Sequence, residues 1–530
     1  MVFFCLVTLQ KKRKNLRKFL SFLKKSKPLY ILKFVFKIIK LKYMNYILFS
    51  VIVLPFLGFV FIITLPLNNI VKEVSFFFSI LTFYISLFLW IFFDNTAASF
   101  QFITDFYWLN SNNYQIRFGI DGISLFFIIL TTFLIPLCFL FFWDQNTKNQ
   151  QDIKYYYGSF LIIETFIIIV FSTLDLVTFY VFFESVLIPI FYIIGVWGTR
   201  DRKVRAGYLL FLYTLLGSLF ILLGIILIFI ETGTTDYLIL LENSFSFTKQ
   251  KILWLAFFFS FATKVPIIPA HIWLPEAHVE APTGGSVILA GILLKLGTYG
   301  FLRFSLPLFP LASIYFRPLI FVISSIAVIY TSITALRQTD IKRVIAYASV
   351  AHINITIAGV FSFSFTGLEG SILQILSHGI VSGALFFCVG VLYDRYHSRL
   401  IKYYSGLTQT IPLFIVFFLL FTIANIGLPG TSSFVGEFLI LIGIFSTNPV
   451  IGIFCGTSLV LGGGYALWLF NRIAYGNLKT QYIYFSKDIN NTEFFTLFPL
   501  ALVTIYIGLY PSSFLEPIHI SCSLLVKQIF

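Results

Sequence analysis

Four charged side chains lie inside long apolar stretches of this 530-residue chain. Lys264 and Lys295 each fall in a stretch long enough to cross a membrane, and Glu184 and Glu437 fall in two others. A charged side chain placed centrally in hydrocarbon costs about 3 kcal/mol or more, so such residues usually pair, face the protein interior and act on ions or protons. The chemistry that these residue types support is the movement of protons or other cations.

Helical geometry places these residues near the middle of the bilayer. At about 1.5 Å per residue, Lys264 lies about 18 Å, Lys295 about 14 Å and Glu184 about 12 Å into its predicted span. His352 and His378 occupy the centres of two further spans. The alternative for an isolated charge is a helix-end residue that extends to the surface, and the alternative for a lone histidine is a hydrogen-bonded packing residue.

Taken together, six residues are predicted to form a polar line across the bundle: Glu184, Lys264, Lys295, His352, His378 and Glu437. Glu164, in the middle of the fourth span, and Asp175, at the junction of two spans, are predicted to support it. Burial disfavours the charged form of a group and an adjacent opposite charge restores it, so moving one partner switches the proton affinity of the other. Driving a proton against about 150–200 mV needs about 3.5–4.6 kcal/mol. The making and breaking of one buried ion pair involves a free energy of similar size.

The composition indicates an all-α polytopic membrane protein. The chain is 58% hydrophobic and only 11% charged, and its apolar runs repeatedly reach the length of about 20 residues that a membrane-spanning helix needs. No stretch is left for a separate soluble domain. We predict about fourteen spans, near residues 44–65, 75–93, 122–143, 159–174, 176–197, 208–230, 252–273, 286–304, 318–336, 341–361, 370–393, 412–444, 450–473 and 494–515.

Two of these spans are interrupted at similar places. Two prolines closely follow Lys264, and the run GLPG at residues 427–430 splits a later span shortly before Glu437. Broken helices at matching positions of two five-helix blocks are typical of inverted-repeat transporters. We therefore predict a basic amphipathic extension (1–42), helices 1–3 (43–157), a first repeat of helices 4–8 (158–305), a second, inverted repeat of helices 9–13 (316–475), and a C-terminal transmembrane helix and tail (490–530).

The formal charge of +15 belongs to the N-terminal extension. Thirteen of the 37 Lys and Arg fall within residues 11–42, which leaves 24 basic residues against 22 acidic ones in the rest of the chain. The charge is therefore not a nucleic-acid-binding signal. The helical spacing of Lys33, Lys37 and Lys40 predicts an amphipathic helix at a lipid interface or on a partner, with a targeting peptide as the alternative.

Loop charges predict the orientation in the membrane. The loops near residues 200–203, 337–343, 395–402 and 479–488 are net basic and share one side if the span count is right. An even number of spans then puts both termini on the other side. The basic extension conflicts with this assignment, and the several short loops are given more weight than the one extension.

Neither a redox centre nor a metal site is predicted. The five cysteines are widely scattered and show no ligand spacing. His271, Glu276, His278 and Glu280 in HIWLPEAHVE resemble a metal constellation, but their intervals fit no common zinc motif. Pro275 is expected to break the helix that would align them.

The run KVPIIPAHIWLPEAHVEAPTGGSVILAGILLKLGTYG, residues 264–300, resembles the antiporter-like subunits of respiratory complex I (NADH:ubiquinone oxidoreductase), and most closely the chain 4 family. A glutamate at position 437, where sister subunits can carry lysine, favours chain 4 over chains 2 and 5. The supporting segments are FGIDGISLFFIILTTFLIP (118–136), YVFFESVLIPI (180–190), RQTDIKRVIAYASVAH (337–352) and GLPGTSSFVGEF (427–438).

The resemblance implies fourteen core helices, two inverted five-helix repeats, and proton translocation coupled at a distance to quinone reduction elsewhere in the complex. It also implies a role for each residue of the polar line. Glu184 matches the family's essential glutamate, Lys264 its pumping lysine and Lys295 its bridging lysine. His352 and His378 match two central histidines of the family, and Glu437 matches the acidic residue of its second broken helix.

The resemblance further implies that NADH, FMN, the iron–sulfur clusters and ubiquinone bind to other subunits, with no cofactor in this chain. The expected partners are other membrane-arm subunits, chains 2 and 5 as neighbours, lipids such as cardiolipin, and accessory subunits on the N-terminal extension. The expected location is the mitochondrial inner membrane, and the chain is expected to be encoded in the organelle. The alternatives are a subunit of a multisubunit cation/proton antiporter and a degenerate subunit that only scaffolds the membrane arm.

Overall fold

The computed structural model describes residues 28–64, 70–107, 115–143, 150–482 and 487–530. Its helices are α3 (Pro28–Thr64), α4 (Val71–Phe92), α5 (Gly122–Phe141), α6 (Gln150–Ser172), α7 (Leu176–Ser185), α8 (Leu187–Trp197), α9 (Lys203–Thr232), α10 (Tyr237–Glu242), α11 (Phe247–Lys264), α12 (Trp273–Glu280), α13 (Thr283–Ile288), α14 (Leu294–Gly300), α15 (Leu306–Leu308), α16 (Pro310–Arg337), α17 (Ile341–Val360), α18 (Phe365–Tyr396), α19 (Pro412–Ile426), α20 (Ser432–Phe445), α21 (Pro449–Ala474), α22 (Asn491–Leu509) and α23 (Ser512–Ile529). Two π-helical stretches, η2 (Leu289–Leu293) and η3 (Phe301–Ser305), flank α14, and the short 3₁₀ turns are η4 (Ile401–Tyr403) and η5 (Leu407–Gln409). The strands are β1 (Gln101–Tyr107) and β2 (Gln115–Ile120).

Within the described residues, twelve helical segments are long and apolar enough to cross a membrane. The helices α19 and α20 are equally apolar but shorter, with 15 and 14 residues. The prediction of an all-α polytopic membrane protein is therefore confirmed. The count of fourteen spans and the division into two inverted repeats stay predictions.

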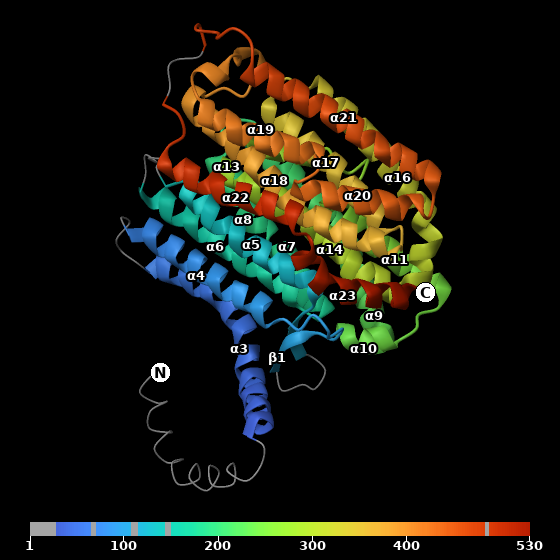
Figure 1. Cartoon of the computed structure of the whole chain (residues 1–530). Coiled ribbons are helices and arrows are strands. Elements are labelled where there is room, and N and C mark those ends of the chain that lie inside the picture. Colours follow the sequence, from blue (N-terminus) through green and yellow to red (C-terminus); the bar gives the residue numbers. More distant parts are fainter. Residues whose placement is uncertain (1–27, 65–69, 108–114, 144–149, 483–486) are drawn as a thin grey trace, which may run out of the picture.

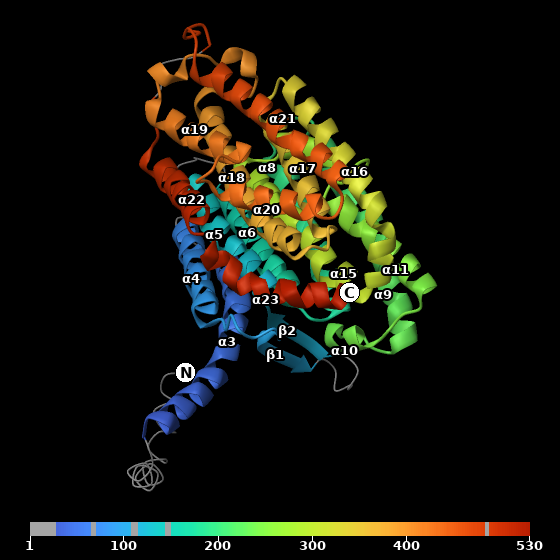
Figure 2. The same cartoon turned by 45° about the vertical axis from the view of Figure 1, so that its right-hand side comes forward.

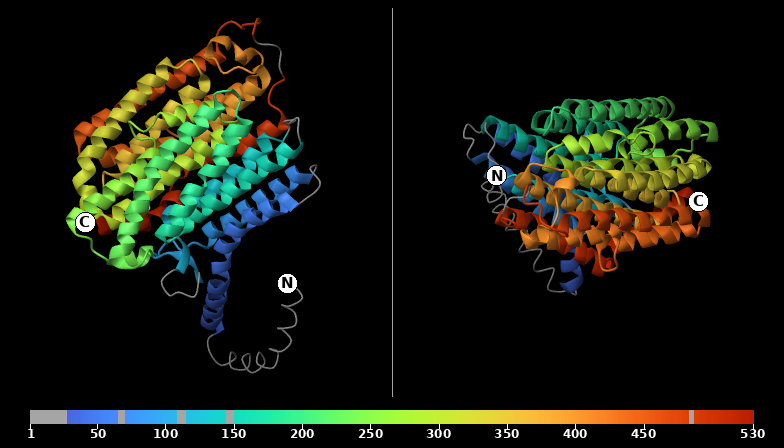
Figure 3. Two further views of the ribbon diagram at one scale, coloured as in Figure 1. Left: turned by 180° about the vertical axis from the view of Figure 1, so that it is seen from behind. Right: turned by 90° about the horizontal axis from the view of Figure 1, so that it is seen from above.

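The bundle has a buried centre and a lipid-facing rim. In Figures 1 and 2 α18 lies in the middle of the bundle. The most apolar parts of α18 and of the helical segment 283–308 are entirely buried. The outer helices α9 and α21 instead expose large apolar side chains such as Leu223 and Val460. Figure 3 shows α3 and α4 at one edge of the bundle, where the N-terminal part of α3 projects outward.

The α18–α20 contact is close because glycines line it. A Cβ atom added to Gly370 would lie 2.7 Å from the backbone nitrogen of Ile440, and one added to Gly436 would lie 2.8 Å from the backbone nitrogen of Gln374. Small residues let helix backbones approach in a membrane, where packing rather than water exclusion drives association. The next residue, Glu437, is thereby held against α18.

Replacing Gly436 with alanine should destabilise the protein by about 1–3 kcal/mol, because the new methyl group meets backbone atoms that cannot move aside. The measurement is the midpoint of thermal unfolding in detergent. The matched control is Gly456→Ala on α21, where an added Cβ atom meets nothing within 4 Å and alanine is the better helix former. Equal midpoints for the two variants would contradict this packing argument.

Both interruptions predicted from the sequence are present. The helix α11 ends at Lys264 and a run of turns precedes α12, while α19 ends at Ile426 before the turns that lead to α20. The expectation that Pro275 breaks a helix was wrong. Pro275 lies in the first turn of α12, where a backbone N–H has no helical partner to lose.

The sequence prediction missed the elements that cover one end of the bundle. The strands β1 and β2 form an antiparallel hairpin, and α23 crosses this end close to it (Figure 2). A single last span over residues 494–515 was wrong, because α22 ends at Leu509 and α23 begins at Ser512, beyond Pro511. The backbone N–H of Gly122 donates a hydrogen bond of 3.1 Å to Ser521 of α23.

The described part of the N-terminal extension, residues 28–42, is continuous with the first span, because α3 begins at Pro28 rather than near residue 44. Residues 1–27 and the side chains of residues 28–45 lie outside the described part of the chain. The amphipathic surface predicted from Lys33, Lys37 and Lys40 therefore stays a prediction.

Candidate functional site

A buried lysine faces a glutamate where α7 and α11 both end. The Nζ atom of Lys264, whose side chain is 1% exposed, lies 3.4 Å from Oε1 of Glu184. It donates a hydrogen bond of 2.5 Å to the carbonyl of Phe183 and lies 3.2 Å from the centre of that aromatic ring. Carbonyl groups at a helix C-terminus and an aromatic face both favour a cation, so three features hold the ammonium group in place.

The second buried lysine, Lys295, lies on α14 beside an under-wound turn. Its Nζ atom lies 2.8 Å from Nδ1 of His378 on α18. It also donates a hydrogen bond of 2.5 Å to the carbonyl of Ala290, in the π-helical stretch η2. Such π-helical turns are frequent at functional sites, and here the turn supplies the acceptor for the ammonium group.

The polar contacts continue from His378 to the second broken helix. The rings of His378 and His352 have centroids 6.0 Å apart, and Nδ1 of His352 lies 2.9 Å from Oε1 of Glu437. Gln374 donates a 2.8 Å hydrogen bond to the same carboxylate oxygen, and the hydroxyl of Tyr465 lies 3.4 Å from Nε2 of His352. A basic group, two imidazoles and a carboxylate thus follow one another through α14, α18, α17 and α20.

We call Lys295, His378, His352 and Glu437 the central line. The structure brings these four predicted residues together and places the other two, Lys264 and Glu184, in a separate pair. The helices that carry the two lysines touch, because a Cβ atom added to Gly297 of α14 would lie 3.0 Å from the carbonyl oxygen of Phe261 on α11.

Of the two supporting residues, neither contacts the central line through the hydrogen bonds seen in the described residues. The carboxylate of Asp175 caps α7 by accepting hydrogen bonds from the backbone and hydroxyl of Thr178, both 2.7 Å, and a third from Thr235. Glu164 is fully buried on α6 and accepts a 2.8 Å hydrogen bond from Thr82 of α4. The geometry gives Asp175 a capping role and leaves Glu164 at a separate site between α4 and α6.

Sequence reasoning missed the neutral residues around the charges. Phe183, Gln374 and Tyr465 were not selected, because an aromatic ring or an amide in an apolar helix carries no obvious sign of function. One signal was available for Gln374: it precedes His378 by four residues and so shares a helix face with it.

The four residues that resemble a metal constellation have other partners or lie apart. Glu276 pairs with Arg343 at 2.8 Å, and the ring of His278 stacks on Phe386 at 4.8 Å. No group of three or more His, Cys, Asp or Glu side chains converges within the described part of the chain.

A buried ion pair lies at the hairpin end of the bundle. Nη2 of Arg303, on η3, donates to Oδ1 of Asp121 at 2.5 Å, and the two side chains are 4% and 8% exposed. The same guanidinium group donates to the Tyr299 hydroxyl at 3.0 Å and lies 4.9 Å from the centre of the Phe100 ring. Burial acts to raise the pKa of Asp121, but Arg303 and hydrogen bonds with Ser124 outweigh it and hold the pKa below its usual value.

An all-helical membrane bundle with lysines and carboxylates buried at broken helices defines the class of antiporter-like membrane subunits. Residues 173–462 match the family model described as "NADH:quinone oxidoreductase/Mrp antiporter, TM". The chain belongs to the NADH-ubiquinone oxidoreductase chain 4 family. It is 54% identical over 483 residues to the protein of that name from Marchantia polymorpha, an alignment that covers 90% of this chain and 97% of the relative.

Two solved structures share the fold. A chain of respiratory complex I from Thermus thermophilus is 27% identical, with a TM-score of 0.83 and coverage of 91% of this chain and 100% of that one. A chain of the Mrp complex from Dietzia sp. DQ12-45-1b is 19% identical, with a TM-score of 0.81 and coverage of 92% and 99%. The second likeness concerns the fold alone.

Proposed function

We propose that this chain is a proton-translocating membrane subunit of respiratory complex I. The family supports complex I as the assembly to which the chain belongs, since the relatives are named NADH-ubiquinone oxidoreductase chain 4. The observation that carries the proton role is the central line, which joins titratable groups from four helices. Nζ of Lys295 lies 2.8 Å from Nδ1 of His378, the ring centroids of His378 and His352 lie 6.0 Å apart, and Nδ1 of His352 lies 2.9 Å from Oε1 of Glu437. A proton can pass between such groups directly or through one water molecule.

In this proposal the pair Glu184–Lys264 is the switch. While the carboxylate lies near the ammonium group, the charged form of Lys264 is stabilised. When the carboxylate moves away, burial disfavours that charge and the lysine releases its proton. Water molecules would carry the proton from Lys264 to Lys295, and Glu437 would pass it toward the exit.

Replacing His378 with leucine tests the central line. The apolar side chain removes the group between Lys295 and His352, so proton transfer should slow by at least about tenfold, which corresponds to about 1.4 kcal/mol in the barrier. The measurement is NADH-driven proton transport by the intact complex in sealed vesicles, with quinone reduction followed in parallel. The matched control is Cys388→Ala, buried on the same helix about 15 Å further along its axis.

Full proton transport by the His378→Leu complex would contradict this route. It would favour the alternative in which the subunit only scaffolds the membrane arm. Slow transport in the Cys388→Ala control would also count against the specific role of His378.

The second candidate function is that of a subunit in a multisubunit cation/proton antiporter, because the family model that matches residues 173–462 is described for both NADH:quinone oxidoreductase and Mrp antiporter. Isolation of the native assembly separates the two. Co-migration of this chain with NADH:ubiquinone reductase activity supports the first proposal, whereas a smaller assembly without that activity supports the second.

The finer features of the assembly belong to the same proposal. NADH, FMN, iron–sulfur clusters and ubiquinone would bind to other subunits, and chains 2 and 5 would be the neighbours in the membrane arm. Accessory subunits would contact the N-terminal extension, and lipids such as cardiolipin would contact the bundle. A location in the mitochondrial inner membrane and an organelle-encoded chain belong to the same proposal, which is supported by the relatives named NADH-ubiquinone oxidoreductase chain 4 from Marchantia polymorpha and Arabidopsis thaliana.

A further inference from the structure

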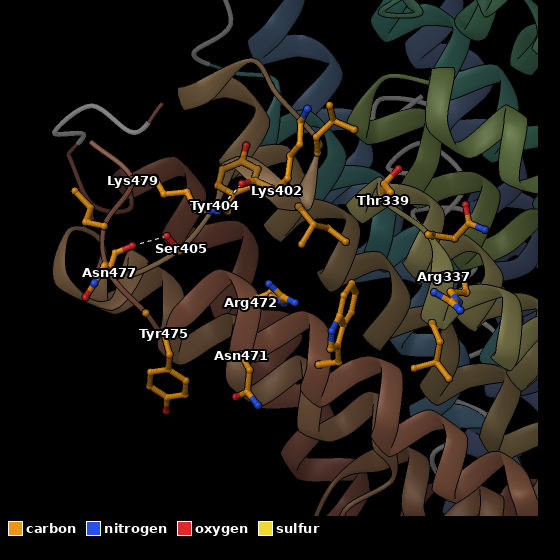
Figure 4. A pocket seen from close by; sticks show the side chains of 17 residues that line it. Arg337, Thr339, Lys402, Tyr404, Ser405, Asn471, Arg472, Tyr475, Asn477 and Lys479 are labelled. Atoms are coloured by element: carbon orange, nitrogen blue, oxygen red, sulfur yellow. Dashed lines mark hydrogen bonds between the residues drawn. The ribbon is translucent and has the colours of Figure 1, made fainter. Parts of the chain in front are cut away.

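A cavity of about 810 Å³ opens at one end of the bundle, away from the central line. Its walls come from the C-terminal ends of α16 and α21, the connection between α18 and α19, and the loop after α21 (Figure 4). These are the segments that carry the net basic loops, so the cavity lies on the predicted basic side of the membrane.

The cavity has a strong excess of positive charge. Its lining includes Arg337, Lys402, Arg472 and Lys479, and none of the lining residues is acidic. Arg337 and Arg472 come from neighbouring helices, and Figure 4 shows both side chains at the cavity. The lining also offers neutral hydrogen-bonding groups from threonine, serine, asparagine and glutamine.

The four basic side chains are exposed, and their contacts leave the charge uncompensated. The Nζ atom of Lys479 donates to the backbone carbonyl of Lys402 at 2.6 Å. The guanidinium carbon of Arg472 lies 5.8 Å from the ring centre of Trp468. Among the ion pairs found in the described residues, none includes a basic residue of this cavity.

The cavity adjoins the lipid-facing surface. About one helical turn before Arg337 and Arg472, the side chains of Ile333 and Leu467 are 50% and 47% exposed. A molecule held there would have an anionic end among the basic groups and an apolar end along α16 and α21. Leu336, Ile401 and Trp468 supply apolar and aromatic surface within the cavity itself.

We propose that this cavity binds the headgroup of an anionic phospholipid, with Arg337 and Arg472 as its main phosphate ligands. Arginine presents a planar group that can donate two parallel hydrogen bonds to a phosphate. Basic pockets at the ends of membrane helices suit this chemistry, and the adjoining exposed apolar surface favours a lipid over a soluble phosphate. The site lies apart from the proton route, and the proposal of a lipid site rests only on the membrane location of the chain.

The double substitution Arg337→Gln with Arg472→Gln tests the site in the intact complex. Each basic residue near a membrane surface should contribute about fivefold in affinity, so the double variant should bind an anionic phospholipid about 25-fold more weakly. The delipidated complex is incubated with vesicles of phosphatidylcholine and phosphatidylglycerol. Retained phosphatidylglycerol is then counted by mass spectrometry. Arg205→Gln is the control, because Arg205 is exposed at the start of α9 and lies outside the cavity.

Selective loss of phosphatidylglycerol in the double variant, with retention in Arg205→Gln, supports the proposal. Three results would overturn it: equal retention in both variants, displacement of the lipid by millimolar inorganic phosphate, and a density map in which an acidic side chain of a neighbouring subunit fills the cavity. Neither arginine belongs to the proton route, so the outcome is independent of the transport measurements.

Discussion

Replacing Lys264 with methionine will reduce NADH-driven proton transport at least about a hundredfold, or about 2.7 kcal/mol in the barrier. Methionine keeps much of the length of the side chain but removes the titratable group that faces Glu184. The replacement is buried and apolar, so the packing between α7 and α11 should persist. The measurement is proton uptake by vesicles that contain the intact complex, normalised to the amount of assembled protein.

The matched control is Lys249→Met on the same helix. Lys249 lies at the other end of α11, is 55% exposed and pairs with Glu231 at 2.8 Å, so its loss should leave transport unchanged because exposed ion pairs contribute little. If Lys264 and Glu184 act as one unit, Lys264→Met combined with Glu184→Gln should be no slower than Lys264→Met alone. Normal transport with Lys264→Met would reject the switch.

Replacing Arg303 with methionine should destabilise the protein by about 3–5 kcal/mol, because it leaves the buried Asp121 carboxylate without its counter-charge. The expected result is a large fall in the amount of assembled complex and in its thermal midpoint. The double variant Arg303→Met with Asp121→Leu should recover much of this loss, since apolar residues of similar size often replace a buried ion pair without penalty. An unaltered midpoint in Arg303→Met would contradict the role given to the pair.

The pH dependence of this effect follows from the lowered pKa of Asp121. A carboxyl group whose folded-state pKa lies below its unfolded value stabilises the fold above the unfolded value, and this contribution is lost as the pH falls through the folded value. In the wild type this contribution should therefore be complete at both pH 6 and pH 8. In Arg303→Met only burial acts strongly on the carboxyl group and raises its pKa, so the difference in thermal midpoint between the wild type and the variant should be at least as large at pH 8 as at pH 6. A difference that is smaller at pH 8 than at pH 6 would contradict the ionised state of Asp121 in the folded protein.

The charged members of the site could be predicted from the sequence because a charge in an apolar stretch stands out without knowledge of its neighbours. The pairing of His352 with Glu437, and of Lys295 with His378, could not be read in the same way. Those contacts depend on how α14, α17, α18 and α20 are rotated against one another, and this is set by packing between helices far apart in sequence. Gln374 illustrates the limit, since only its contact with Glu437 separates it from an ordinary buried amide.

The fold was predictable to the extent that hydropathy reports contact with lipid. The spans and both interruptions follow from apolar length and from proline and glycine. The hairpin of β1 and β2 was missed because its strands, of seven and six residues, are much shorter than the apolar runs that indicate a membrane span. The helix α23 was missed because residues 494–515 form one apolar run in the sequence. Asp175 was predicted to support the polar line although its spacing to Thr178 is also that of a helix cap, and the structure shows the cap.

The four members of the central line come from four helices, each near the middle of its span or at a break within it. Protons that pass along such a series travel parallel to the plane of the bilayer. The membrane voltage acts perpendicular to that plane, at about 2.3 kcal/mol per charge for 100 mV, so these lateral transfers do almost no electrical work. In the proposed function the electrical load would therefore fall on the steps that connect the line with the two aqueous compartments, and a change in voltage should alter the rate of those steps alone.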